Sequence, residues 1–187
     1  LKEAMAKADV HIVSNPEFLS EGNAIRDFLE PSRIVIGANS REHSERVAKL
    51  YSKLNAPILM SSWESAELIK HTANAFLAMK LTFINEIATL CEMTGADIKD
   101  VTDGIGYDPR IGSDYMSAGP GWGGSCFPKD SASLAQVARS FGFDFTLLEH
   151  TIDLNQKHLD RTAQKVQHLV PTGSPHRKVA AWGLTFK

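Results

Sequence analysis

The sequence has few cysteines, no excess of positive charge and no long apolar run. Its 187 residues include two cysteines, Cys91 and Cys126, and carry a formal net charge of -2. So few cysteines favour a reducing, cytoplasmic setting over a disulfide framework. The basic residues are dispersed, and no apolar run reaches the roughly 20 residues of a membrane span. We therefore expect neither nucleic acid nor a membrane as a partner.

We do not expect the chain to hold a metal ion, and we do not expect it to be a complete protein. The seven histidines show no paired spacing typical of a zinc site. The sequence opens on Leu1 without an initiator methionine and stops at Lys187, directly after an apparent strand. Its hydrophobic content of 43% is nevertheless enough to build a core. We interpret the chain as the central fragment of a longer protein.

The first 62 residues alternate between strand and helix patterns. Apolar runs at residues 10–13 and 33–37 are typical of buried strands, and a third strand is expected at 58–60. Residues 40–54 between the last two runs have helical spacing. Because strands that alternate with helices usually pair in parallel, this part predicts the edge of a parallel α/β sheet.

One long helix should follow. Ser61-Ser62-Trp63-Glu64 offers a capping box, and no glycine or proline interrupts the sequence until Gly95. Roughly 30 residues at about 1.5 Å each give about 45 Å. Apolar side chains surround much of this helix, so we expect it to pack in a core and across the interface of a homodimer.

Shorter elements fill the rest of the chain. Helices are expected at residues 97–103, 131–141 and 146–170, and a strand at 178–183 after a linker rich in proline and glycine. The predicted fold class is α/β at both ends with a mainly α-helical central domain. The expected division of the chain is into residues 1–62, 63–172 and 173–187.

Cys126 lies in the segment with the strongest chemical signature. It follows a glycine-rich loop and precedes Pro128, which suits the first turn of a helix. A thiol is a useful nucleophile where a helix N-terminus or a cation stabilises its thiolate and glycines leave room for a substrate. The alternative is a tight turn around a buried structural cysteine. Cys91, inside the long helix, is predicted to be a core residue.

Two pairs of polar residues are further candidates. Glu17 and Glu21 follow the first expected strand, and the loops after strands bind ligands in open α/β sheets. Glu21 is equally suited to cap the helix that follows it. Lys70 and Asn74 are four residues apart on the long helix and could together hold an oxyanion, although a solvated helix face explains many such pairs.

Four ordered motifs resemble those of the UDP-glucose/GDP-mannose dehydrogenase family, especially its UDP-glucose 6-dehydrogenases. They are NPEFLSEGNAI at 15–25, AELIK with NAFL at 66–77, GGSCFPKD at 123–130 and GLTFK at 183–187. The resemblance implies that residues 1–62 form the C-terminal part of an NAD-binding Rossmann-like domain. Residues 63–172 would form a dimerisation and catalytic domain, and 173–187 a linker and the first strand of a UDP-binding α/β domain.

The same resemblance implies NAD-dependent four-electron oxidation of UDP-glucose to UDP-glucuronate. Cys126 would be the nucleophile and would carry first a thiohemiacetal and then a thioester. Lys70 and Asn74 would stabilise the oxyanion, Glu17 would act as acid and base, and Asp130 would orient or deprotonate the hydrolytic water. The family's glycine-rich dinucleotide fingerprint has no counterpart in these residues, so the fragment alone is expected to be inactive.

Binding residues follow from the resemblance as well. Glu21, Cys126 and Lys129 would lie toward the NAD, and Arg110 would reach the substrate of a neighbouring subunit. The complete set expected to contact the sugar nucleotide is Phe18, Leu19, Ser20, Glu21, Lys70, Asn74, Arg110, Ser117, Gly119, Gly121, Trp122, Gly123, Phe186 and Lys187.

Three alternatives stay open at this point. The substrate could be a related nucleotide sugar, GDP-mannose or UDP-N-acetylmannosamine. Cys126 could instead serve a cysteine hydrolase or acyltransferase, which would need a histidine base such as His71 or His150. The chain could also be a non-catalytic dimerisation module.

Overall fold

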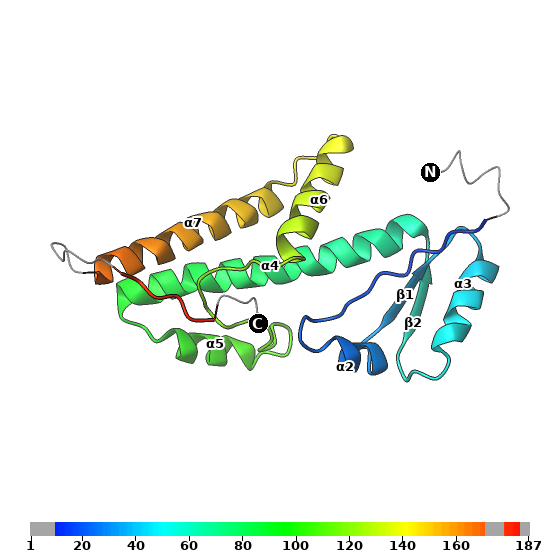
Figure 1. Ribbon diagram of the computed structural model, residues 1–187, viewed down its shortest axis with the longest axis horizontal. Helices are drawn as coiled ribbons and strands as arrows, with labels where there is room; N and C mark the ends of the chain where they lie inside the picture. Colours follow the sequence, from blue (N-terminus) through cyan, green and yellow to red (C-terminus); the bar gives the residue numbers. More distant parts are fainter. Residues whose placement is uncertain (1–9, 171–177, 184–187) are drawn as a thin grey trace. The chain divides into compact units, whose positions relative to one another are not determined.

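A computed structural model describes residues 10–170 and 178–183 (Figure 1). They divide into two compact units, with the boundary between Thr72 and Ala73. Phe186 and Lys187, which are among the expected substrate contacts, lie outside the described residues.

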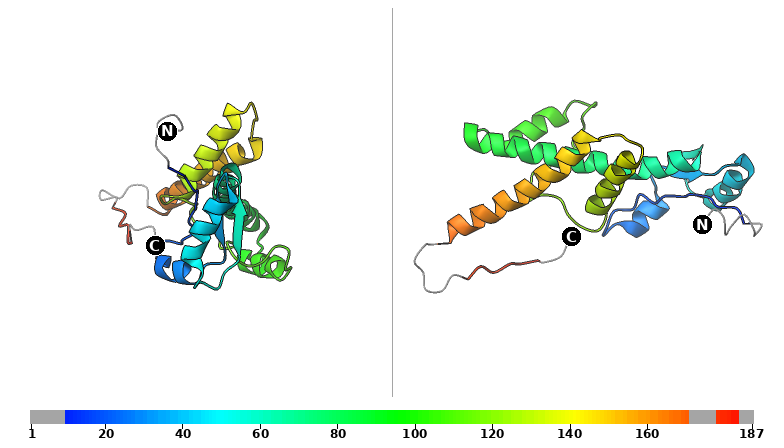
Figure 2. Two further views of the ribbon diagram at one scale, coloured as in Figure 1. Left: turned by 90° about the vertical axis from the view of Figure 1, so that its right-hand side faces the viewer. Right: turned by 90° about the horizontal axis from the view of Figure 1, so that it is seen from above.

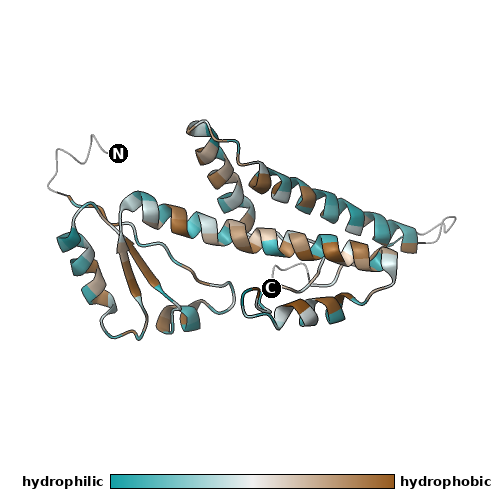
Figure 3. Cartoon of the chain, turned by 180° about the vertical axis from the view of Figure 1, so that it is seen from behind, coloured by the Kyte–Doolittle hydropathy of each residue, from teal (hydrophilic) through white to brown (hydrophobic). Residues whose placement is uncertain are grey.

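Unit 1 is built on two parallel strands. Strands β1 (Ile34–Gly37) and β2 (Ile58–Ser61) pair in register, with Ile34 opposite Ile58. All four residues of β1 are buried, as its apolar, β-branched composition predicts. Both strands are coloured hydrophobic over much of their length in Figure 3. The parallel pairing predicted for this part of the chain is confirmed.

A helical crossover joins the two strands. It consists of α3 (Arg41–Ala48) and a single 3-10 turn, η1 (Lys49–Tyr51). The side chain of Ser40 caps α3 by accepting a hydrogen bond from the backbone N–H of His43 at 3.3 Å. A strand, a helix and a parallel strand in this order form the βαβ unit.

The strand expected at residues 10–13 is wrong. In this segment the chain is irregular, and only an isolated antiparallel bridge forms, with Ser14 and Gly37 exchanging backbone hydrogen bonds of 2.8 and 2.7 Å. The indole of Trp63 also donates to the carbonyl of Ile12 at 3.0 Å. An apolar run becomes a strand only where a neighbour can pair along its length, and one bridge does not meet that requirement.

The long helix is confirmed as α4 (Trp63–Thr94). Its cap is shifted by one residue from the prediction, because the hydroxyl of Ser62, not Ser61, accepts from the backbone N–H of Ser65 at 3.2 Å. The helix start packs closely on β1, since a Cβ on Gly37 would lie only 2.5 Å from the Cβ of Ala66. This position therefore requires a glycine for helix and strand to meet.

Among the described residues of unit 2, three helices follow α4. They are α5 (Ile98–Gly106), α6 (Phe127–Ser140) and α7 (Thr146–Leu169). Helix α5 runs three residues beyond the predicted end at residue 103. In Figure 2, α6 and α7 form a connected pair that meets α4. Their core consists of Ala75, Leu134, Ala135 and Leu148, with Phe145 and Ile152 packed against it.

A cluster of charges ties α7 to α4. Glu92 accepts hydrogen bonds from Lys165 and, at 2.7 Å, from Arg161. These two donors, Lys165 first, hold the pKa of the Glu92 carboxyl below its ordinary value. The cluster is exposed to solvent, so its attraction is screened.

The strand expected at residues 178–183 is also wrong. These residues lie in no helix or strand, and they are exposed. A strand needs a hydrogen-bonded neighbour, and the described residues do not supply one to this segment. What the structure shows is therefore a small parallel sheet followed by a helical region.

Candidate active site

Cys126 stands at the N-cap of α6 and is exposed. Pro128 occupies the first turn, as expected from its fixed φ and missing N–H. The hydroxyl of Ser125 lies 3.6 Å from the thiol sulfur. The alternative of a buried structural cysteine is wrong for Cys126, whereas Cys91 is buried as predicted.

A buried polar pair lies one turn along the helix from Cys126. The side chain of Asp130 is 4% exposed, and its backbone N–H donates to the carbonyl of Cys126 at 2.8 Å. Asn74 of α4 donates its side-chain N–H to Asp130 at 2.5 Å. Since an amide nitrogen carries two N–H groups, the second one can serve a substrate oxygen. Asn74 is buried, so the solvated-face alternative is wrong for this residue.

Lys129 points its ammonium toward the same carboxylate. Its Nζ lies 3.7 Å from Asp130 Oδ1, and most of its side chain is exposed. The cation is therefore accessible to an anionic ligand while it stays near the buried carboxylate.

The glycine-rich loop before Cys126 is held at Trp122. The backbone N–H of Trp122 donates to Asn155 Oδ1 at 2.8 Å, and the amide of Asn155 donates back to the Trp122 carbonyl at 2.9 Å. The indole N–H of Trp122 donates to the hydroxyl of Thr82 at 2.7 Å. These three bonds anchor the loop to both α4 and α7.

A second anchor holds the loop at Gly119. Its N–H donates to Asn85 Oδ1 at 2.9 Å, and its carbonyl lies 2.8 Å from His158 Nε2. Five of the expected substrate contacts occur on this stretch. Ser117 and Gly119 are exposed, Gly121 and Gly123 are half-buried, and Trp122 is buried.

Sequence reasoning missed the residues that anchor the loop. They are Thr82, Asn85, Asn155 and His158. A partial signal was present, because Asn85 follows Asn74 by eleven positions, about three helical turns, and so falls on the same face of α4. Buried side-chain amides on an otherwise apolar helix face need hydrogen-bond partners, and for Asn85 the glycine-rich loop supplies one.

In unit 1 the structure brings Glu17 and Lys70 together. Lys70 Nζ lies 3.1 Å from Glu17 Oε1, and Glu17 Oε2 accepts the backbone N–H of Leu19 at 2.6 Å. The Lys70 ammonium also lies 5.6 Å from the ring centroid of Phe18. Its side chain is largely buried, which makes the solvated-face alternative wrong for Lys70 as well.

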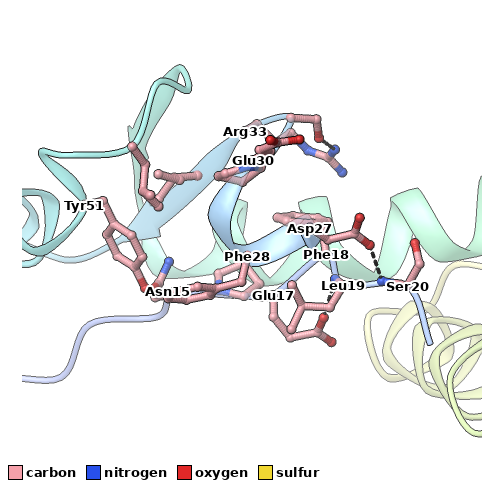
Figure 4. A pocket seen from close by; sticks show the side chains of 15 residues that line it. Asn15, Glu17, Phe18, Leu19, Ser20, Asp27, Phe28, Glu30, Arg33 and Tyr51 are labelled. Carbon is pink, nitrogen blue, oxygen red and sulfur yellow. Dashed lines mark hydrogen bonds between the residues drawn. The ribbon is translucent and has the colours of Figure 1, made fainter. Parts of the chain in front are cut away.

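A pocket of about 290 Å³ lies beside this pair, within unit 1 (Figure 4). The guanidinium of Arg33 lies over the ring of Phe18, 3.8 Å from its centroid. The backbone N–H of Ser20 donates to Asp27 at 2.7 Å, one of the contacts drawn as dashed lines in Figure 4. The pocket is thus lined by the same 15–20 segment that carries Glu17.

Glu21 is exposed in the turn before α2 (Ala24–Leu29). The N-cap of that helix is Asn23, which makes no side-chain cap hydrogen bond. The alternative of Glu21 as the helix cap is therefore wrong, and its carboxylate is accessible.

Arg110 is paired within its own loop. Its guanidinium donates to both oxygens of Asp108, at 2.6 to 3.1 Å, and its backbone N–H donates to Oδ1 at 2.9 Å. These bonds hold the pKa of the Asp108 carboxyl below its usual range. The Arg110 side chain is otherwise exposed. Its predicted contact with a neighbouring subunit stays a prediction.

The described residues contain no group of three or more histidine, cysteine, aspartate or glutamate side chains placed to hold a metal ion. In the same part of the chain, every helix is too short or too polar to cross a membrane.

Comparisons with known proteins place these features in a family. The model of the NAD binding domain of the UDP-glucose/GDP-mannose dehydrogenase family matches residues 1–55, and that of its central domain matches residues 64–157. The chain is 44% identical to the UDP-glucose 6-dehydrogenase TuaD of Bacillus subtilis over 187 residues, and 46% identical to a UDP-glucose 6-dehydrogenase of Rhizobium meliloti over 194 aligned positions.

These alignments cover all of this chain but 40% and 44% of the two relatives. Among solved structures, a UDP-glucose dehydrogenase from Pyrobaculum islandicum superposes with a TM-score of 0.85 at 36% identity, over 90% of this chain and 40% of that one. Because the central-domain model alone matches half of the sequence, and the loop, thiol and buried pair described above lie within that match, the chain belongs to the UDP-glucose/GDP-mannose dehydrogenase family.

Proposed function

We propose that the protein catalyses the NAD-dependent four-electron oxidation of UDP-glucose to UDP-glucuronate, with Cys126 as the covalent nucleophile. The observation that carries this proposal is an exposed thiol at the start of α6, one turn from the buried pair of Asp130 and Asn74. Relatives that share 44% and 46% of the aligned residues are named as UDP-glucose 6-dehydrogenases. Both supports favour this reaction over a cysteine hydrolase, which would need a histidine base.

The architecture of unit 1 is suited to binding the NAD cofactor. The pair β1 and β2 with the crossover α3 is the βαβ unit from which dinucleotide-binding sheets are built. When bound, NAD⁺ would supply the acceptor for hydride. Exposed Glu21 and Lys129, together with Cys126, are the residues that we assign to its neighbourhood.

In the first oxidation the primary alcohol of the sugar loses a proton and a hydride to become an aldehyde. Glu17 is suited to accept that proton, because its carboxylate is exposed to solvent yet fixed by Lys70 and by the N–H of Leu19. The Lys70 ammonium in turn favours the charged form of the substrate oxygen.

Cys126 then adds to the aldehyde. A C–S bond forms, the carbonyl π bond breaks, and its electron pair becomes the oxyanion of a thiohemiacetal. The free N–H of Asn74 and the ammonium of Lys70 are our candidates to stabilise this oxygen, and losing one such donor typically costs about 100- to 1000-fold in rate. Loss of a second hydride converts the thiohemiacetal to a thioester.

Hydrolysis releases the product. Water adds to the thioester carbonyl, the C–S bond breaks, and the thiolate of Cys126 is restored together with a carboxylate. Asp130 is placed to orient this water or accept its proton, because its position is held by Asn74 and by the first turn of α6. Its burial keeps the carboxylate away from bulk solvent.

We assign substrate contacts to two segments, residues 18–21 in unit 1 and residues 117–123 in unit 2. The first lines the 290 Å³ pocket in part, and the second is the anchored glycine-rich loop. Residues 1–62 would be the C-terminal part of a Rossmann-like domain and 63–172 the dimerisation and catalytic domain. Residues 173–187 would be a linker and the start of a UDP-binding domain.

A homodimer through α4 is also proposed. Phe76, Phe83 and Leu90 recur every seven residues on α4 and are 55%, 57% and 53% exposed. Large apolar side chains repeated at this spacing form a stripe that suits a helix–helix interface. In such a dimer Arg110 would contact the substrate of the partner subunit.

The test is Cys126→Ser in the complete protein, supplied separately with UDP-glucose, GDP-mannose and UDP-N-acetylmannosamine. We expect wild-type protein to oxidise UDP-glucose, and the variant to lose UDP-glucuronate formation by about 100-fold or more, because a hydroxyl is a far weaker nucleophile than a thiolate. Cys91→Ala, which removes the buried cysteine, serves as the matched control and should retain turnover. Carboxylate formation by Cys126→Ser at the control rate would refute the assignment.

If either of the other two sugars is oxidised instead, the substrate is the related nucleotide sugar. If none is oxidised and the protein forms a tight dimer, the non-catalytic dimerisation module takes the place of the enzyme.

A further inference from the structure

We propose that Asn155 is a positioning residue that fixes the glycine-rich loop and, through Trp122 and Phe127, the thiol of Cys126. This inference rests on the proposed function, since it assigns a supporting role in that reaction. Asn155 lies on α7, at a distance of 33 residues in sequence from the residue that it holds.

The amide of Asn155 is matched to one peptide unit of the loop. It is 6% exposed, accepts the N–H of Trp122 at 2.8 Å and donates to the carbonyl of Trp122 at 2.9 Å. Two opposed hydrogen bonds fix both the position and the orientation of Trp122's backbone, which a single bond could not do. The backbone N–H and carbonyl of Trp122 make these bonds in a buried position, so loss of the Asn155 amide would leave both groups unsatisfied.

The loop is shaped around the same side chain. Gly121 has a φ of +122°, and a Cβ at this position would lie 3.0 Å from Asn155 Oδ1 and from Leu159 Cδ2. A Cβ here would therefore be crowded against α7, and Asn155 or Leu159 would have to shift to make room for it. This close approach brings the peptide of Trp122 within reach of the amide.

The link from Trp122 to the thiol runs through aromatic packing. The indole is fixed by its bond to Thr82, whose hydroxyl donates in turn to the carbonyl of Ala78 at 2.9 Å. The Trp122 ring packs edge-to-face on Phe127, with centroids 6.4 Å apart and an interplanar angle of 84°. Phe127 is the first residue of α6 and follows Cys126 directly. A shift of Trp122 is thus transmitted to the N-terminus that carries the thiol.

Asn155 would therefore affect the reaction rate without contacting the substrate. A misplacement of about 1 Å at a reacting group can cost about 100-fold in rate. We expect loss of the Asn155 amide to lower kcat by about 10-fold or more. The rate at which iodoacetamide alkylates Cys126 should also change by at least about 3-fold. Alkylation becomes slower if the thiol is misplaced and faster if the loop opens.

The experiment compares Asn155→Leu and Asn155→Asp with Gln156→Leu, all in the complete protein. Gln156 is the neighbouring exposed residue on α7, so its variant controls for changes to the helix itself. The measurements are kcat and KM for UDP-glucose, the rate of Cys126 alkylation without substrate, and the melting temperature. The aspartate variant is nearly isosteric, but its carboxylate cannot donate to the Trp122 carbonyl.

A pH series separates positioning from a general loss of structure. Protonation of the aspartate in Asn155→Asp restores a donor, so its alkylation rate, taken relative to wild type at each pH, should return toward one as the pH falls from about 8 to about 5. Asn155→Leu has no such group and should show no recovery. The melting temperature of Asn155→Asp, measured over the same pH series, shows whether a recovery of the alkylation rate merely follows a recovery of the fold.

Three results would overturn the proposal. One is kcat and alkylation rates for both Asn155 variants within about 2-fold of Gln156→Leu. Another is an Asn155→Asp ratio that stays constant over the pH series. The third is loss of fold in both variants, which would mean that Asn155 serves folding. If wild-type protein oxidises no nucleotide sugar, the proposed function fails, while the alkylation series, which needs no substrate, still decides the role of Asn155.

Discussion

Replacing Gly121 by alanine should destabilise unit 2 strongly. At a φ of +122° an L-amino acid is strained by about 1 to 3 kcal/mol. The new Cβ would also lie 3.0 Å from Asn155 Oδ1 and from two carbons of Leu159, and such overpacking typically costs about 1 to 3 kcal/mol. Leu159 is partly exposed and can move, so the lower half of the combined range applies and we expect a loss of about 3 kcal/mol.

The assay is thermal unfolding followed by circular dichroism. At about 2 to 4 °C per kcal/mol for a protein of this size, Gly121→Ala should melt about 6 to 12 °C below wild type. Gly119→Ala is the matched control in the same loop, because no atom lies within 4 Å of its added Cβ. It should change the stability by less than about 0.5 kcal/mol. Equal melting temperatures for the two variants would show that neither backbone strain nor crowding at Gly121 limits the stability of unit 2.

Two further predictions concern charged residues. Glu92→Gln should lower the melting temperature at neutral pH. The folded-state pKa of Glu92 is below its ordinary value of 4.5, so the stabilisation by its charged form is fully present above pH 4.5. The difference in melting temperature from wild type should vanish as the pH falls through the folded-state pKa. A difference that persists at acidic pH would contradict it. Asp130→Asn should keep its hydrogen bond from Asn74 and melt within about 2 °C of wild type, yet lower UDP-glucuronate formation by about 100-fold or more. Full activity in this variant would exclude Asp130 from hydrolysis.

Local sequence signals predicted much of the fold. Helix α4 follows from more than thirty positions without glycine or proline, and β1 from a β-branched run that is buried on all sides. Cys126 was found because glycines, a proline and the thiol occur within one short segment, and such a segment encodes both a turn and a helix start. These features depend on neighbours in sequence.

Features that depend on distant partners were not predictable in this way. The apolar runs at 10–13 and 178–183 were expected to be strands, but a strand requires a partner, which composition alone does not reveal. The same holds for Asn155 and Trp122, which are 33 residues apart and meet only because α7 packs beside the loop. Single asparagines on a helix do not show which backbone group they will bind.

The proposed thioester on Cys126 is tested most sharply by the amount of NADH formed per UDP-glucose consumed by the complete protein. A thioester on Cys126 requires two successive hydride transfers, so we expect two NADH per sugar and UDP-glucuronate as the product. One NADH per sugar with an aldehyde as the end product, or no NADH at all, would contradict it.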